Sequence, residues 1–168
     1  AARSCGLVFM GAYTRAAVDH YIGSFLTIRR AFSKPDTIVA YRTDITWDPE
    51  WPSLLFQERD RPDTTYCHRG RLYIPSSSMF IHLVSLTKGA MRMIIVSQLD
   101  REAQMRGLIT TLNKNRANFT PVATPIVFVR CEEFAADSLG ELTADSRHFS
   151  GYQALLADTL EQGYARLV

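Results

Sequence analysis

The sequence predicts an α+β domain dominated by an antiparallel β-meander, barrel-like or strongly curved, with a short N-terminal helix and a longer C-terminal helix. Brief apolar runs separated by turn residues follow one another from residue 22 to residue 131, a spacing that is typical of such a meander. The runs 79–87 and 91–99 are apolar on both faces, which we expect of central strands that are covered twice. After residue 150 the apolar residues recur at a helical period instead.

Composition indicates a globular protein with one core. The 168 residues are 46% hydrophobic and 21% charged, which is the balance of a folded domain. The 19 basic and 17 acidic residues leave a formal charge of +2, and because the basic residues form no cluster, we expect no nucleic-acid face on this segment. No run is long enough for a membrane span. Three cysteines without metal or disulfide spacing fit a cytoplasmic protein: Cys5, Cys67 and Cys131.

We expect a single domain, 1–168, with an N-terminal helical segment (1–21), the β-meander (22–131), a connector (132–149) and a C-terminal helix (150–166). Within the first part, apolar residues recur every four positions, at Tyr13, Ala17 and Tyr21. Ser150 and Gln153 have the spacing of a capping box, so the last helix should begin there. The chain begins at Ala1 rather than at Met, which would fit a part of a longer protein, while terminal processing or renumbering would give the same start.

The strands of the meander are predicted from period-two alternation and from the turns between them. Arg69–Gly70 should be the tight turn of one hairpin, and Lys88–Gly89 the turn of a central hairpin within 71–98. Pro121 and Pro125 cannot donate to a strand ladder, so the last strand should be bulged or lie partly at an edge. The expected strands are 22–32, 39–47, 53–58, 64–68, 71–74, 79–87, 91–99, 107–112 and 119–131.

No catalytic residue, metal site or cofactor is predicted. A pairing of Cys67 with His82 lacks a third orienting residue, and the four histidines have no metal-ligand spacing. Asp44 and Glu58 could face each other across neighbouring strands, but ion pairs with arginine are the simpler role for both. The run 76–78, three serines after a proline, is expected to be a turn because no helix follows to form a phosphate site.

A few polar residues stand out in otherwise apolar strands. A buried charge without a partner costs several kcal/mol, so each such residue must reach water, a counter-ion or a ligand. On a concave sheet face they would form a pocket, and we therefore predict ligand binding by Arg42, Tyr73, His82 and Arg92. The alternative is that the two arginines pair with Asp44 or Glu58, or that these side chains face solvent.

The order of several segments resembles the C-terminal domain of bacterial transcriptional regulators that carry an N-terminal helix-turn-helix of the Xre, phage-repressor-like, class. The resemblance covers about residues 21–130. It rests on patterns of strand residues and turns: Tyr21–Arg29, Phe32–Ser33 with Pro35, Ile38–Val39, the hairpin Tyr66–Tyr73 with Gly70 inside it, Ile81–Val84, Arg106–Ile109 and Pro125–Val129.

This resemblance implies a non-enzymatic domain that senses an effector or mediates oligomerisation in a cytoplasmic transcriptional regulator. The partners that it implies are a small-molecule effector and a second copy in a homodimer, with no membrane. DNA would be bound only through a module outside this chain, because 11–21 offers one helix and not a helix-turn-helix. The alternative interpretation is a stand-alone small-molecule-binding β-barrel protein or an enzyme with the same barrel.

Overall fold

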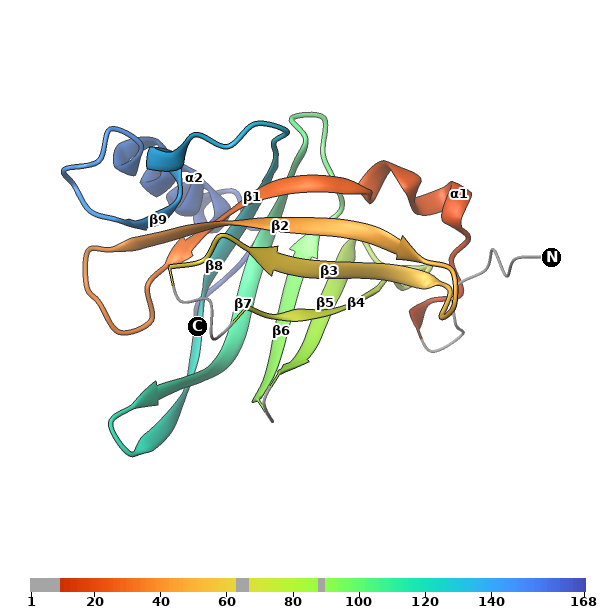
Figure 1. The fold of residues 1–168 in the computed structure, drawn as a ribbon, viewed down its shortest axis with the longest axis horizontal. Coiled ribbons are helices and arrows are strands. Elements are labelled where there is room, and N and C mark those ends of the chain that lie inside the picture. The colour runs from red at the N-terminus through yellow and green to blue at the C-terminus, as the bar shows by residue number, and fades with distance from the viewer. Residues whose placement is uncertain (1–9, 63–66, 88–89) are drawn as a thin grey trace.

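The computed structural model describes residues 10–62, 67–87 and 90–168. Its strands form one antiparallel sheet in the order β1-β8-β7-β6-β5-β4-β3-β2-β9. A further pairing of β1 with β2 closes the first eight strands into a barrel (Figure 1). The predicted fold class is therefore confirmed, and of the two shapes that the sequence left open, the closed barrel is the one observed.

The elements follow one another with short connections. The strands are β1 (Gly23–Arg30), β2 (Ile38–Asp48), β3 (Ser53–Arg59), β4 (Arg69–Tyr73), β5 (Phe80–Thr87), β6 (Ala90–Ser97), β7 (Gln104–Asn115), β8 (Asn118–Arg130) and β9 (Gly140–Leu142). The helices are α1 (Arg15–Val18), which continues into a 3₁₀ turn (Asp19–Tyr21), a second 3₁₀ turn (Ala136–Ser138) and α2 (Phe149–Glu161).

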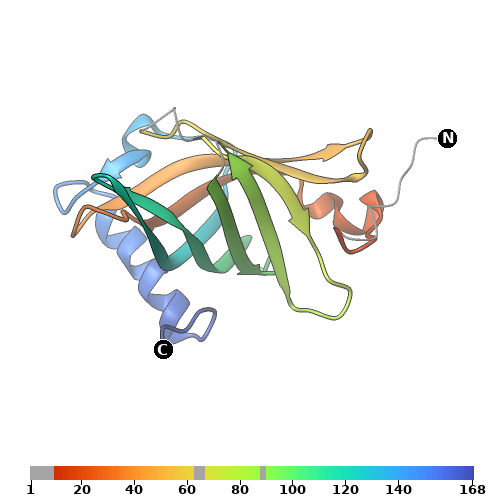
Figure 2. The same ribbon diagram turned by 90° about the horizontal axis from the view of Figure 1, so that it is seen from below.

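One end of the barrel interior is apolar and is sealed by the N-terminal segment. Tyr13 anchors this segment, because its hydroxyl donates to the carbonyl oxygen of Leu72 at 2.7 Å and accepts from the amide of Leu54 at 2.9 Å. α1 lies at this end in both ribbon views (Figures 1 and 2). The buried cluster here includes Met10, Tyr13, Val18, Tyr21, Phe25, Ile45, Leu54, Phe56, Leu72, Ile81, Ile94 and Phe128.

The second apolar cluster lies outside the barrel, under α2. Figure 2 shows α2 lying along the outer side of the barrel. Its residues Tyr152 and Leu156 pack on side chains from β1, β2 and β8, among them Ile28, Ile38 and Val127. The outward residue Ile28 of β1 is therefore buried under the helix, while Phe25, Thr27 and Arg29 occupy the inward face of this strand.

α2 does not cover the central hairpin. The predicted pairing of β5 with β6 is confirmed from Phe80↔Ser97 to Thr87↔Ala90, whereas the turn expected at Lys88–Gly89 lies outside the described residues. On the outer face of β6, however, Met91 is 60% exposed and Met93 is 39% exposed. The expectation that the hairpin is covered on both faces thus fails for these outward methionines within the described chain.

Four local predictions are wrong. Arg69–Gly70 is no turn, because both residues lie inside β4, where Gly70 pairs with Phe56 on one side and with Ser85 on the other. Ser150 caps nothing, since α2 begins one residue earlier after His148 and has no side-chain cap. The helix also ends at Glu161 rather than at residue 166, and the connector contains the short strand β9, which pairs with the start of β2.

The prolines of β8 lie at an open edge, as predicted. β8 pairs with β7 over residues 118–129 but with β1 only over residues 126–130. The amide of Cys131 points to β1, where it donates to Ser24, and amides two residues apart in a strand point the same way. Pro121 and Pro125 therefore stand where an amide would face the unpaired edge, so neither removes a hydrogen bond from the barrel.

Gly70 should be required for closure at β4. A Cβ atom there would lie 2.0 Å from the carbonyl oxygen of Val84 and 2.9 Å from the ring of Phe56. We predict that Gly70→Ala lowers the free energy of unfolding by about 2–3 kcal/mol through overpacking, measured by urea denaturation. Gly151→Ala is the matched control, because nothing lies within 4 Å of its Cβ position in α2, and it should stabilise by about 0.5–1 kcal/mol. Equal effects of the two substitutions would contradict the steric explanation.

Candidate functional site

The end of the barrel interior away from α1 is lined by polar side chains, which we call the polar end. Along the inward face of β1 the apolar Phe25 is followed by the polar Thr27 and Arg29. The inward residues of the neighbouring strands also change from apolar to polar toward this end. None of the following inward residues is more than 5% exposed: Thr27, Arg29, Tyr41, Thr43, Glu58, His68, Ser85 and Arg92.

Glu58 is the centre of the polar end. Its carboxylate accepts from the guanidinium groups of Arg92 at 2.7 Å and Arg61 at 2.6 Å, and from the backbone amide of His68 at 3.1 Å. Burial alone would raise the pKa of this carboxyl, but the attraction of Arg92 and Arg61 outweighs burial and holds the pKa below its ordinary value. Glu58 is therefore ionised inside the barrel at neutral pH.

His68 lies beside this ion pair and is held in its neutral form. Its Nδ1 atom is 3.2 Å from the hydroxyl of Ser85. Burial, and after it the charge of Arg92, lower the pKa of His68 to about 4, although Glu58 acts in the opposite direction. A neutral imidazole next to two guanidinium groups adds hydrogen-bonding capacity without adding a third positive charge.

Arg29 and Tyr41 form the other half of the polar end. The guanidinium of Arg29 donates to the carbonyl oxygen of Arg30 at 3.0 Å and lies 4.1 Å from the ring centre of Phe32. The ring of Tyr41 lies between two arginines. Its centre is 5.7 Å from the guanidinium carbon of Arg29 and 5.0 Å from that of Arg61. Tyr41 and Arg29 are both poorly solvated. Burial therefore raises the pKa of Tyr41 and lowers the pKa of Arg29.

Among the described residues of the polar end, the buried charges do not balance. Among the described residues, three guanidinium groups face the single carboxylate of Glu58: Arg29, Arg61 and Arg92. Arg29 has no ion pair within that part of the chain. Four buried polar atoms there also lack a hydrogen-bond partner: the Nε atoms of the three arginines and the hydroxyl oxygen of Tyr41. An arrangement of this kind has unused capacity for a hydrogen-bond acceptor that carries negative charge.

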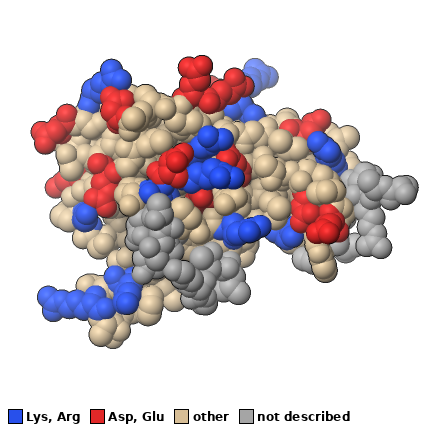
Figure 3. All heavy atoms as spheres, viewed as in Figure 1, with Lys and Arg blue, Asp and Glu red and all other residues tan. Residues whose placement is uncertain are grey.

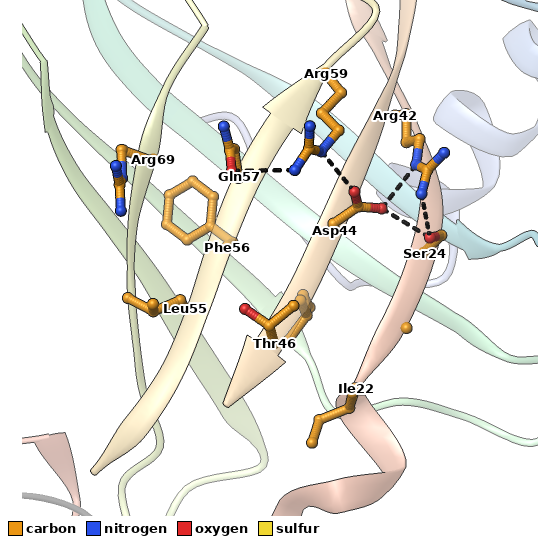
Figure 4. A pocket seen from close by; sticks show the side chains of 12 residues that line it. Ile22, Ser24, Arg42, Asp44, Thr46, Leu55, Phe56, Gln57, Arg59 and Arg69 are labelled. Carbon is orange, nitrogen blue, oxygen red and sulfur yellow. Dashed lines mark hydrogen bonds and ion pairs between the residues drawn. The ribbon is translucent and has the colours of Figure 1, made fainter. Parts of the chain in front are cut away.

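A second polar site lies on the outer face of β1 to β4. It is a hollow of about 380 Å³, and Figure 4 shows Arg42 and Arg59 converging on Asp44 from two sides. Each guanidinium Nε lies 2.7 Å from an Asp44 oxygen, and Ser24 donates to the same carboxylate at 2.7 Å. Burial would raise the pKa of Asp44, but its partners hold it below the usual value. Here the polar groups pair with one another.

The four predicted ligand-binding residues do not lie together. Arg42 lines the outer hollow. Tyr73 and His82 are register partners on the outer face of β4 and β5, with stacked rings 5.6 Å apart. Arg92 alone points into the polar end. Both arginines form the ion pairs that the sequence analysis gave as an alternative, Arg42 with Asp44 and Arg92 with Glu58. A ligand-binding role for the four residues stays a prediction.

Sequence reasoning missed Arg29, Arg61 and His68 as members of this site. The available signal was the parity of single strands: Leu54, Phe56 and Glu58 occupy alternate positions, so the charged residue continues an inward apolar row. Phe25, Thr27 and Arg29 repeat that pattern in β1. Arg61 carried no such signal, because it comes from the connection between β3 and β4.

The other candidate sites from the sequence analysis, two residue pairs and a metal site, are not formed by the described residues. Cys67 precedes β4, whereas His82 pairs at the opposite end of that strand with Tyr73. Asp44 and Glu58 lie on opposite faces, since Thr43 is the register partner of Glu58. Within residues 10–62, 67–87 and 90–168, no three histidine, cysteine or acidic side chains could hold a metal ion together. None of the helices in this part of the chain has the length and apolarity to cross a bilayer.

Charged side chains on the visible surface are mixed in sign. Figure 3 shows arginine and lysine interspersed with aspartate and glutamate on the face seen in Figure 1. On the part of this face that the structure describes, neither sign forms a large continuous region.

The lowered pKa of His68 predicts a pH-dependent stability. Because this pKa is about 4 in the folded protein and 6.5 as its ordinary value, the unfolded chain binds more protons between these values. Stability should therefore rise as the pH increases from about 4 to 6.5. Measured as Tm against pH, this slope should flatten in His68→Gln and persist in His82→Gln, which changes the outer ring stack. An unchanged slope in His68→Gln would contradict the assignment.

The chain matches no protein-family model, no curated protein and no solved structure. The functional interpretation of the barrel therefore depends on the geometry of its own side chains.

Proposed function

We propose that this chain is a non-enzymatic effector-sensing domain of a bacterial transcriptional regulator, and that the polar end of the barrel is its ligand site. One observation carries the proposal: buried guanidinium and phenol groups with unused hydrogen-bonding capacity gather inside an otherwise apolar barrel. Such groups cost stability in the free protein. A ligand that satisfies them would offset this cost, which is the usual reason for a destabilising arrangement at a binding site.

The regulatory part of the proposal is supported by the sequence resemblance to regulators of the Xre class. In such a protein the DNA-binding module precedes the sensing domain. A ligand can alter DNA binding only if it binds two arrangements of the protein with different affinities. We propose that the barrel forms a homodimer and that ligand binding changes how the two subunits pack, and so the spacing of their DNA modules.

The competing proposal is a stand-alone binding protein or an enzyme built on the same barrel. Binding alone would explain the buried polar groups equally well. An enzyme would in addition need a general base or a nucleophile at the site. His68 is the candidate for the base, because it is neutral and lies beside Glu58 and Ser85.

The gene around this chain gives the sharpest test of the regulatory proposal. The reading frame upstream of residue 1 should encode a helix-turn-helix module of about 60 residues. We predict that the full-length protein then shifts a fragment of its own upstream region in a gel and behaves as a dimer in light scattering. An open reading frame that starts near residue 1 would favour the stand-alone protein.

The sensing role is tested on the chain itself. A thermal-shift screen with small acids, nucleotides and neutral metabolites should contain compounds that raise Tm by several degrees, because a ligand that binds only the folded state stabilises it. If no compound raises Tm and the chain is a monomer at every concentration, both the sensing and the dimer parts of the proposal are wrong.

A further inference from the structure

We infer that the ligand of the polar end is a small oxyanion, a carboxylate or a phosphate, and that Glu58 is a built-in competitor occupying part of its site in the free protein. This inference rests on the proposed ligand-binding function and deepens it. It assigns charge recognition to Arg29 and Arg92, and it gives Tyr41 the role of a hydroxyl donor.

The charge of the site determines the class of ligand. Among the described residues, Arg29 is 3% exposed and has no carboxylate partner, while Arg92 is 4% exposed and shares Glu58 with Arg61. A neutral or cationic ligand would leave this positive excess uncompensated in a poorly solvated interior. An oxyanion compensates it, and its oxygens match the planar donors of guanidinium groups.

The aromatic side chains around Arg29 hold its guanidinium in place. Its carbon lies 4.1 Å from the ring centre of Phe32 and 5.7 Å from that of Tyr41. Stacking on ring faces leaves the in-plane N–H groups of a guanidinium available for hydrogen bonds. Among the described residues, the guanidinium of Arg29 makes one short hydrogen bond, to the carbonyl oxygen of Arg30 at 3.0 Å. The hydroxyl of Tyr41 has no hydrogen-bond partner in the described chain.

Glu58 resembles the ligand in its chemistry. Its two oxygens are already divided between two arginines, Oε1 accepting from Arg92 and Oε2 from Arg61. An arriving oxyanion would have to share these donors with Glu58 or displace it. The carboxylate therefore weakens anion binding through repulsion while it stabilises the empty barrel.

The outer hollow is the rival site for an anion. It also contains several arginines, but Asp44 pairs with both Arg42 and Arg59, and their side chains are 36% and 51% exposed. Exposed ion pairs of this kind contribute little and are screened by salt. The hollow therefore supplies matched control residues, with the same side-chain chemistry outside the barrel.

The test is a titration of the full chain with sodium phosphate, sodium benzoate and neutral benzamide at constant ionic strength, followed by thermal shift and calorimetry. At least one oxyanion should bind and raise Tm, and benzamide should not. Comparison of phosphate with benzoate separates the two oxyanion classes. Native mass spectrometry of the chain incubated with a bacterial metabolite extract identifies what it retains.

Substitutions inside the barrel separate charge recognition from folding. Arg29→Met should weaken oxyanion binding by about tenfold to a hundredfold, because a charge-assisted hydrogen bond is lost. It should also raise the Tm of the ligand-free chain by about 2–4 °C, since an unpaired buried charge is removed. Glu58→Gln should lower the Tm of the ligand-free chain and tighten oxyanion binding by about tenfold. Arg42→Met and Arg59→Met should leave oxyanion affinity unchanged.

Each remaining outcome contradicts a defined part of this inference. If Arg42→Met or Arg59→Met abolishes binding while Arg29→Met does not, the anion binds outside the barrel and the inference is wrong. If benzamide binds as well as benzoate, or the retained metabolite is neutral or cationic, the oxyanion assignment is wrong while the proposed sensing function stands. If nothing binds and nothing is retained, the sensing function is wrong as well. Weaker binding by Glu58→Gln would overturn the competitor role alone.

Discussion

Because β2 pairs with β1 along residues 38–45 and with β3 along residues 42–48, the sheet closes on itself and encloses its inward face. Closure removes the inward side chains of the strands from solvent, except at the end of the β7–β8 hairpin that projects beyond the barrel. Each inward residue must then be apolar, hydrogen-bonded or paired with a counter-charge. The apolar cluster at one end and the polar end at the other are two solutions to this single constraint. The charge imbalance among the described residues of the polar end matters because closure keeps these side chains from solvent.

The two ends of the interior are built by different parts of the chain. The apolar end is sealed by the segment before β1, which Tyr13 ties to β3 and β4 through its hydroxyl. The polar end takes residues from the strands and from the connection after β3, which supplies Arg61. The first arrangement is apolar, with the Tyr13 hydroxyl hydrogen-bonded on both sides, whereas the second keeps unpartnered polar atoms among its described residues. Stability is thus concentrated at one end and unused binding capacity at the other.

Alternation within strands made the barrel predictable, and it failed where contacts between distant residues decided the outcome. The period of two places Tyr41 and Arg42 on opposite faces of β2, but the expectation that Arg42 faces the concave side is wrong, because Tyr41 occupies the inward face. Arg69–Gly70 read as a turn because glycine is a turn residue, yet Gly70 is needed for the close approach of β5. The membership of Arg29 and Arg61 in one site depends on barrel closure, which brings together residues more than thirty positions apart, and no local pattern encodes that.

The open edge of β8 has a consequence for how this protein behaves at high concentration. The β7–β8 hairpin extends beyond the neighbouring strands in Figure 1, and a long unpaired strand would ordinarily recruit the same strand of another molecule into a continuous sheet. Pro121 and Pro125 stand where amides would face that neighbour, so two of the donors needed for such a ladder are missing. The backbone edge that a partner could pair with is therefore weakened, while the side chains of Leu112 and Phe119 are exposed on the same hairpin.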